Sequence, residues 1–317
     1  MNVSTLKRIV TAILVVGALG VGAIVLWGRL ETARESATAR TQQGSGEARR
    51  AIIGTSVEGR PIEAYTYSPA TSGGSDKARI RPGGLSTSSL DARSHLVFVG
   101  GVHGGYEWNS VLLAYTFMDY LDANKSFIPE DVEVTVIPSA NPDGVYKVIG
   151  KEGRFSAMEV SAKVDSVPGR FNAHQVDLNR NFDCKWKSES MWKGNKVSAG
   201  SAPFSEPETK AIRDFVLKNK PDAVVFWHSQ ANAVYASECE NGILAKTRDI
   251  MKAYSKASGY PAVDSFDAYE VTGDAEGWLA SINIPAITVE LATHETVEWK
   301  KNLAGIEALL VLYSQSN

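Results

Sequence analysis

The stretch HLVFVGGVHGGYE occupies residues 95–107 and combines a strand with chemically active side chains. Residues 95–99 are mostly apolar and rich in valine, and the glycine pair that follows them is typical of a strand end. His103 and Glu107 come directly after that end. Because ligands bind at the carboxyl ends of strands in open α/β sheets, this stretch predicts a sheet with a site at its edge.

Strands and helices alternate along the chain around this stretch. We expect two strands joined by a glycine turn at 52–62, further strands at 132–137, 223–227 and 286–291, and helices at 107–121, 205–217 and 297–313. The strand at 132–137 is expected to be closed by Pro138 and by a turn at 141–144. The segment 71–93 is rich in glycine and serine and is predicted to be a surface loop. The alternation predicts an α/β fold, with one domain built on a mixed, largely parallel central sheet flanked by helices.

The N-terminal region contains a candidate membrane anchor. Residues 9–27, IVTAILVVGALGVGAIVLW, form an uncharged apolar run of 19 residues. A helix of that length nearly crosses a hydrocarbon core of about 30 Å, whereas the apolar core of a cleaved signal peptide has about 7–15 residues. We therefore predict a tail at 1–8, a transmembrane anchor at 9–27, a polar stalk at 28–50 and a globular domain at 51–317. A cleaved signal peptide is the alternative.

The charges that flank the anchor do not decide its orientation, because arginine and lysine residues lie on both sides. A short N-terminal tail is typical of a signal anchor, so we expect a single-pass protein of the cell membrane with its globular domain outside the cytoplasm. The lipid bilayer is then one expected partner.

Composition excludes several other classes of protein. The 317 residues are 44% hydrophobic and 22% charged, with a formal net charge of −3, which is typical of a folded chain. That charge gives no reason to expect a nucleic-acid partner. Two cysteines, Cys184 and Cys239, either form one disulfide or stay free. The oligomeric state does not follow from these features.

Polar side chains follow three of the predicted strands. The strand at 95–99 leads to His103 and Glu107, the strand at 223–227 to His228, and the last strand to Glu290. Two imidazoles and one carboxylate match a catalytic zinc site with three protein ligands and one open position. We predict one zinc ion per chain on His103, Glu107 and His228. Glu290 is the predicted general base, which takes a proton from water that the metal makes more acidic.

Several motifs then follow one another in a recognisable order. They are GTSVEGRP at 54–61, GGVHG at 100–104, NPDG at 141–144, VDLNRNF at 176–182, FSEPE at 204–208, HS at 228–229 and TVEL at 288–291. Over about residues 52–313 the chain thereby resembles the zinc carboxypeptidases of the carboxypeptidase A superfamily, the M14 peptidases. The resemblance implies a zinc carboxypeptidase-like fold and hydrolysis of the C-terminal bond of a peptide.

The resemblance also implies roles for residues near the fourth motif. Asn179 and Arg180 would hold the terminal carboxylate of the substrate, since a guanidinium grips a carboxylate through two hydrogen bonds. Arg170 matches the arginine that polarises the scissile carbonyl and stabilises the oxyanion. Asp177 would accept a hydrogen bond from the free ring nitrogen of the ligand His103.

Two more substrate-binding residues are implied by the resemblance. Tyr269 corresponds to the mobile tyrosine that closes over the substrate. Glu276 lies in the segment 273–276, which corresponds to the floor of the pocket for the departing residue. Acidic residues there favour a basic or amine-bearing side chain. The segment is also similar to that of bacterial members that trim murein peptides carrying diaminopimelate.

One spacing departs from the family pattern. The family places its first two ligands as His-x-x-Glu, whereas this chain has His103-x-x-x-Glu107. The glycines at 104 and 105 can absorb the extra residue, because glycine adopts backbone angles that other residues avoid. No acidic residue other than Glu107 lies between His103 and Asp119, so Glu107 remains the predicted ligand.

Three functions are compatible with these motifs. The first is an active zinc carboxypeptidase, and the second is a murein peptide amidase that uses the same metal and base on an isopeptide bond. Their substrate partners are a peptide or a murein peptide. The third is a non-catalytic carboxypeptidase-like binding domain, which would be expected to lack a ligand or the base; none is missing here.

Overall fold

The computed structural model describes residues 48–69 and 93–314. The predicted tail and anchor, nearly all of the stalk and nearly all of the loop at 71–93 lie outside these residues. No helix within the described ranges is both long and apolar enough to span a membrane. The first strand begins at Arg49, so residues 49 and 50 of the predicted stalk belong to the sheet.

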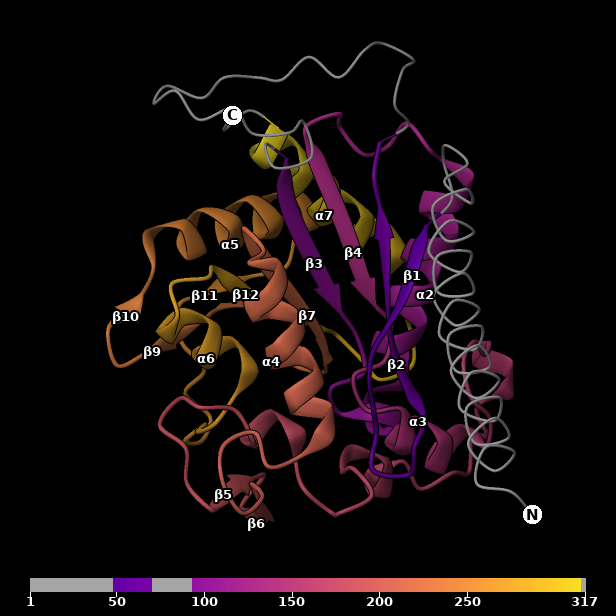
Figure 1. The fold of residues 1–317 in the computed structure, drawn as a ribbon, viewed down its shortest axis with the longest axis vertical. Helices are drawn as coiled ribbons and strands as arrows, with labels where there is room; N and C mark the ends of the chain where they lie inside the picture. Colours follow the sequence, from indigo (N-terminus) through magenta and orange to yellow (C-terminus); the bar gives the residue numbers. More distant parts are fainter. Residues whose placement is uncertain (1–47, 70–92, 315–317) are drawn as a thin grey trace, which may run out of the picture. The chain divides into compact units, whose positions relative to one another are not determined.

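An eight-stranded sheet crosses the domain in the order β1-β2-β4-β3-β7-β12-β8-β11 (Figure 1). Its strands are β1 (Arg49–Thr55), β2 (Pro61–Tyr67), β3 (Ser94–Val99), β4 (Val132–Ile137), β7 (Ala223–Ser229), β8 (Ala233–Ala236), β11 (Ala262–Val263) and β12 (Ala286–Leu291). The four central strands β4, β3, β7 and β12 run parallel, while β1, β2 and β8 introduce antiparallel pairs. The predicted α/β fold with a mostly parallel central sheet is confirmed.

Two small hairpins lie outside this sheet. One pairs β5 (Glu189–Trp192) with β6 (Asn195–Ser198), and the other pairs β9 (Glu238–Cys239) with β10 (Gly242–Ile243).

Helices cover both faces of the sheet because its central strands are apolar on both sides. The helices are α2 (Trp108–Ala123), α3 (Pro142–Ile149), α4 (Pro207–Asn219), α5 (Ala245–Ser258), α6 (Ala275–Ser281) and α7 (Trp299–Ser314). Val225 and Trp227 of β7 join one apolar cluster with α2, α5 and α7. The alternate residues Val224 and Phe226 join a second cluster with α4 and α6, as the period of two along a strand requires (Figure 1).

Within the described ranges, four short 3-10 helices lie in the connections between these elements. They are η1 (Gly104–Glu107), η2 (Ala157–Glu159), η3 (Val167–Arg170) and η4 (Leu178–Arg180). Predicted site residues lie in η1, η3 and η4.

One predicted turn is instead the start of a helix. The segment Asn141-Pro142-Asp143-Gly144 was expected to close strand β4 as a turn, but α3 begins at Pro142. The side chain of Asn141 accepts a hydrogen bond from the backbone N–H of Gly144, and Gly150 ends the helix with φ of 78°. Asparagine before a helix and proline at its first position are both favourable, which explains why the turn-like sequence starts a helix.

Candidate active site

The predicted site residues meet where parallel strands end. Strands β3, β7 and β12 are neighbours, so their carboxyl ends lie at one edge of the sheet. His228 lies near the end of β7, Glu290 lies opposite it on β12, and β3 leads through η1 to Glu107. The argument from strand ends therefore placed these side chains correctly.

Three buried side chains form a compact group of possible metal ligands. Nδ1 of His103 lies 2.8 Å from Oε1 of Glu107, and Nδ1 of His228 lies 2.9 Å from Oε2 of the same glutamate. The two Nδ1 atoms are 3.1 Å apart. Such close nitrogens need a proton or a cation between them. Imidazole nitrogens and a carboxylate oxygen are ordinary zinc ligands, so His103, Glu107 and His228 fit a metal ion.

The charges in this group fit a site for a cation. Burial alone raises the pKa of Glu107, but His103 and His228 outweigh burial and lower that pKa. Burial lowers the pKa of His228, whereas Glu107 and Glu276 raise it well above the usual range. Positive charge is therefore favoured between the ligands, where a divalent ion would replace the proton.

The extra residue between His103 and Glu107 is accommodated by two glycines. Gly104 has φ of 45°, and a Cβ there would lie 2.6 Å from the backbone oxygen of Gly169. A Cβ on Gly105 would lie 2.5 Å from Cβ of Val148. The longer spacing thus forms the 3-10 turn η1, packed tightly against α3 and η3, and still brings Glu107 to His103.

Carboxylates lie behind both ligand histidines. Oδ1 of Asp177 is 3.3 Å from Nε2 of His103, at the position expected from the sequence. Oε1 of Glu276 is 3.6 Å from Nε2 of His228 and accepts a hydrogen bond of 2.8 Å from Thr288. Glu276 was expected only as a residue of the pocket floor. Its proximity to His228 was missed because the two residues lie far apart in the sequence, on α6 and β7.

Arg170 is fixed beside the ligands by two hydrogen bonds. Its Nε and Nη2 donate to Oδ2 of Asp177 at 3.0 and 2.7 Å, which leaves Nη1 3.8 Å from Oε1 of Glu107. The guanidinium carbon also lies 4.5 Å from the ring centroid of Trp192. One end of this cation therefore faces the space next to the ligands.

A cavity of about 770 Å³ joins the ligand group to the predicted substrate-binding residues. Asn179 accepts a hydrogen bond from Ala275 N–H through Oδ1. Arg180 donates to the backbone oxygens of Asn179 and Met191, and its buried Nε has no hydrogen-bond partner among the described residues. The Tyr269 ring centroid lies 6.0 Å from the Arg180 guanidinium carbon. Arg180 thus brings to the cavity a cation that forms no ion pair with a carboxylate among the described residues.

Glu290 lines the same cavity at the end of β12. Its Oε2 accepts a hydrogen bond of 3.2 Å from the backbone N–H of Ala231. Burial, together with the negative charge of Glu107, raises the pKa of Glu290 to about 7. A carboxylate with such a pKa can both accept and release a proton near neutral pH.

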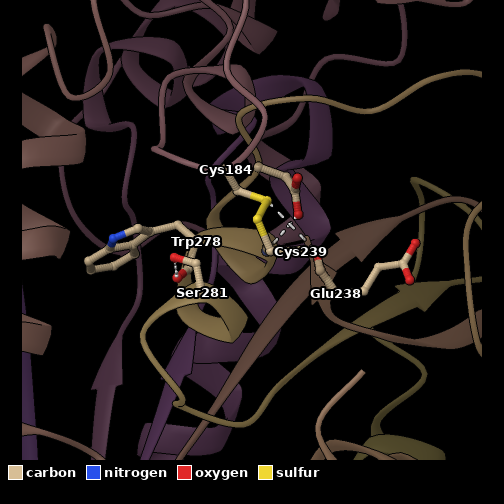
Figure 2. Close-up of a disulfide and its surroundings, with 7 residues drawn as sticks. Cys184, Glu238, Cys239, Trp278 and Ser281 are labelled. Atoms are coloured by element: carbon tan, nitrogen blue, oxygen red, sulfur yellow. Dashed lines mark hydrogen bonds between the residues drawn. A yellow bond between two sulfur atoms is a disulfide. The ribbon is translucent and has the colours of Figure 1, made fainter. Parts of the chain in front are cut away.

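The structure joins Cys184 and Cys239 in a disulfide, a pairing that the sequence left open (Figure 2). Cys184 lines the cavity, and Cys239 lies in β9. The backbones of Phe182 and Cys184 form hydrogen bonds of 2.8 and 2.7 Å with Gly273, just before α6. A Cβ on Gly273 would lie 2.2 Å from the Arg180 backbone oxygen, so this close approach requires glycine. The disulfide therefore anchors the segment that carries Arg180.

A histidine–glutamate–histidine group with a spare carboxylate, at the edge of a mostly parallel sheet, is the arrangement expected of a metal-dependent hydrolase. The family model described as zinc carboxypeptidase, Peptidase M14, matches residues 36–303. The chain belongs to this family, as the motifs indicated.

Curated relatives include two bacterial enzymes of peptide chemistry. The chain is 26% identical over 208 residues to gamma-D-glutamyl-L-diamino acid endopeptidase 1 of Lysinibacillus sphaericus, covering 59% of this chain and 52% of that protein. It is 30% identical over 131 residues to murein peptide amidase A of Escherichia coli K12, covering 38% of this chain and 50% of that protein. The chain thus spans about half the length of these relatives.

Solved structures share the fold. The murein-tripeptide amidase of Escherichia coli O157 superposes with a TM-score of 0.55 at 23% identity, covering 86% of this chain and 95% of the amidase. Carboxypeptidase A of Helicoverpa armigera gives a TM-score of 0.62 at 18% identity, covering 86% of this chain and 68% of the carboxypeptidase. At these identities the likeness establishes the architecture alone.

Proposed function

We propose that the protein is a zinc-dependent metallocarboxypeptidase, which hydrolyses the bond before a residue that carries a free carboxylate. The observation that supports this proposal most strongly is the set of side chains that line one cavity. The cavity holds the three possible ligands, the carboxylate of Glu290 and the Arg180 cation.

Each side chain has a separate task in this proposal. Zinc held by His103, Glu107 and His228 would supply a Lewis acid that acidifies water and polarises the scissile carbonyl. Glu290 takes a proton from the attacking water, whose oxygen bonds to the carbonyl carbon, and delivers that proton to the amine as the carbon–nitrogen bond breaks. The free Nη1 end of Arg170 donates to the carbonyl oxygen as negative charge develops there.

The remaining groups position the substrate. The Arg180 guanidinium and Nδ2 of Asn179 donate to the terminal carboxylate, and the nearby ring of Tyr269 covers it. Asp177 holds both Arg170 and His103 in place, so one buried carboxylate links the arginine to the ligand group. Only the last peptide bond of a substrate is then placed next to the metal ligands and Glu290.

Acidic side chains support a preference for an amine-bearing departing residue. Glu276 is buried and Asp274 is half-buried at the start of α6, and both line the cavity. Burial and the neighbouring Glu276 raise the pKa of Asp274 to about 6. For Glu276, burial raises the pKa, but His228 outweighs it and the net pKa is lowered. Glu276 is therefore negatively charged at neutral pH and attracts a cation.

A murein peptide amidase is the second candidate. Two relatives support it, since one is named for an L-diamino acid and the other for murein peptides. A diamino acid would offer a carboxylate to Arg180 and an amine toward Glu276. A non-catalytic binding domain has less support, because every predicted ligand and the predicted base lie in the cavity.

We also propose that the domain lies outside the cytoplasm, attached to the cell membrane. The disulfide supports this location, because disulfides persist in oxidising compartments. The anchor at 9–27 remains a prediction from the sequence. Treatment of intact cells with a membrane-impermeant labelling reagent tests this location. A domain that is labelled only after the cells are permeabilised would contradict it.

A substrate profile of the zinc-loaded full chain tests the proposed activity. The substrates are a murein tripeptide and matched peptides that end in lysine, leucine or glutamate, each with and without a chelator. We expect release of the last residue, preference for the amine-bearing residues and loss of turnover with chelator. Equal turnover of the leucine peptide would contradict the predicted preference, and turnover of C-terminally amidated peptides would contradict exopeptidase action.

A further inference from the structure

One wall of the cavity has no task in the proposed mechanism. It is formed by Tyr106 of η1 and by Trp192 and Lys193 of the β5–β6 hairpin. The rings of Tyr106 and Trp192 pack edge to face with their centroids 5.2 Å apart. The wall therefore combines two aromatic rings with one cation.

Lys193 is held over these rings. Its Nζ donates a hydrogen bond of 3.0 Å to the hydroxyl of Tyr106, and it lies 5.7 and 5.6 Å from the ring centroids of Tyr106 and Trp192. No carboxylate among the described residues forms an ion pair with Lys193. The neighbouring Lys187 and Lys196, in contrast, pair with Glu270 and Glu189. Lys193 is thus an exposed cation that lines the cavity without an ion-pair partner among the described residues.

The position of Arg170 relates this wall to the substrate. On one side its guanidinium carbon lies 4.5 Å from the Trp192 centroid and 5.8 Å from the Tyr106 centroid. On the other side it is bonded to Asp177, next to the segment with Asn179 and Arg180. A peptide with its terminal carboxylate at Arg180 and its scissile carbonyl at Arg170 would extend its acyl side toward Lys193.

We propose that Lys193, with Tyr106 and Trp192, forms a subsite for a carboxylate on the residue whose carbonyl is cleaved. This inference rests on the proposed function. A glutamyl residue joined through its γ-carboxyl carries such a charge, because its α-carboxylate remains free. Lys193 is exposed, but its ammonium is held beside the Tyr106 hydroxyl and the two rings, so a carboxylate at this position meets a cation that is already in place.

Two matched peptides test the subsite. The first is acetyl-γ-D-glutamyl-L-lysine, in which the α-carboxylate of the glutamyl residue is free. In the second, that glutamyl α-carboxylate is replaced by a carboxamide, and the terminal carboxylate of lysine stays free in both. We expect kcat/KM to favour the carboxylate by about 3- to 5-fold, as for a charge pair at an exposed position. The Lys193→Met substitution should reduce this ratio to about 1, while Lys193→Arg retains most of it. Lys196→Met on the same hairpin is the control and should keep the wild-type ratio.

Binding separates this inference from the proposed activity. Calorimetry on the zinc-loaded Glu290→Gln protein measures the affinity for both peptides without turnover. A carboxylate preference that disappears in the Lys193→Met, Glu290→Gln protein supports the subsite, even if neither peptide is hydrolysed by the wild type. Equal affinity for the two peptides, or a preference that survives Lys193→Met, would overturn it.

Discussion

Glu290 on β12 and His228 on β7 occupy paired positions on adjacent parallel strands. This register places the predicted base beside a predicted ligand without any contribution from loop conformation. Side chains held by the central strands of a sheet are positioned more rigidly than those on loops, which suits a site that needs fixed geometry. The base and the ligand are therefore part of the core architecture.

Replacement of Glu290 by glutamine should separate metal binding from catalysis. The amide keeps the shape of the side chain but cannot accept the proton of water. We expect zinc content to remain unchanged and kcat to fall by about 10²–10⁴-fold, the usual contribution of a general base. Elemental analysis and peptide hydrolysis measure the two effects, and full activity of the variant would exclude Glu290 as the base.

Titration of the metal-free protein should show the raised pKa of Glu290. Burial and the charge of Glu107 raise this pKa to about 7 from an ordinary value of 4.5. Between these values the native state holds a proton that the unfolded chain has released. Glu290 therefore contributes less to stability as pH rises from 4.5 to 7.

Carbon NMR of labelled glutamate, assigned with Glu290→Gln, measures this titration directly. The same variant should show a flatter dependence of unfolding free energy on pH over that window. Zinc should shift the titration to lower pH, because a nearby cation favours the carboxylate. A resonance that titrates near 4.5 in the metal-free protein would refute the predicted environment.

Substitution of Asp177 by asparagine should weaken the metal site from behind. The change removes the negative charge and leaves a single acceptor oxygen, where Asp177 uses one oxygen toward His103 and the other toward Arg170. We expect zinc affinity to fall by about 10- to 100-fold, as for other carboxylates behind ligand histidines. Competition with a chromogenic chelator gives the affinity. Glu189→Gln, an exposed control, should bind zinc normally; a normal affinity in Asp177→Asn would mean that the carboxylate does not support the ligand.

Loss of the disulfide should destabilise the domain and loosen the Arg180 segment. The bond closes a loop with a sequence separation of 55 residues. The chain-entropy model gives about 4 kcal/mol for such a loop, and measured values are often smaller. We expect the Cys184→Ser, Cys239→Ser double variant to lose about 2–4 kcal/mol in unfolding free energy and to show a raised KM. Reducing agent should lower the unfolding free energy of the wild type by the same amount and leave that of the variant unchanged. An unchanged KM in the variant would mean that the disulfide does not contribute to substrate binding.

Strand ends were the most predictable part of the site. His103, His228 and Glu290 each follow or end a short apolar run, and parallel strands bring such positions to one edge. The position of Asp177 beside His103 was implied by the family resemblance of the motif VDLNRNF, and the structure places its carboxylate there. These predictions depended on local pattern and on one topological rule.

Other features could not be deduced in the same way. The pairing of Glu276 with His228 and the wall at Lys193 depend on how α6 and the β5–β6 hairpin pack against distant strands. Strand β11 has two residues, which is too short for a period of two to show. Helix α5 was missed although Ile250, Met251 and Tyr254 are spaced for one buried face, so there the signal was present and was overlooked.

Zinc binding by the wild type and by Glu107→Gln tests the central claim most directly. Calorimetric titration of the metal-free full chain should give one zinc ion per chain for the wild type, and X-ray absorption should show two imidazole ligands. Glu107→Gln should lose most of this affinity, since the amide replaces an anionic ligand with a neutral one. A wild type that binds no zinc, or a Glu107→Gln protein that binds it as tightly, would contradict the proposed ligand group and the hydrolytic function that depends on it.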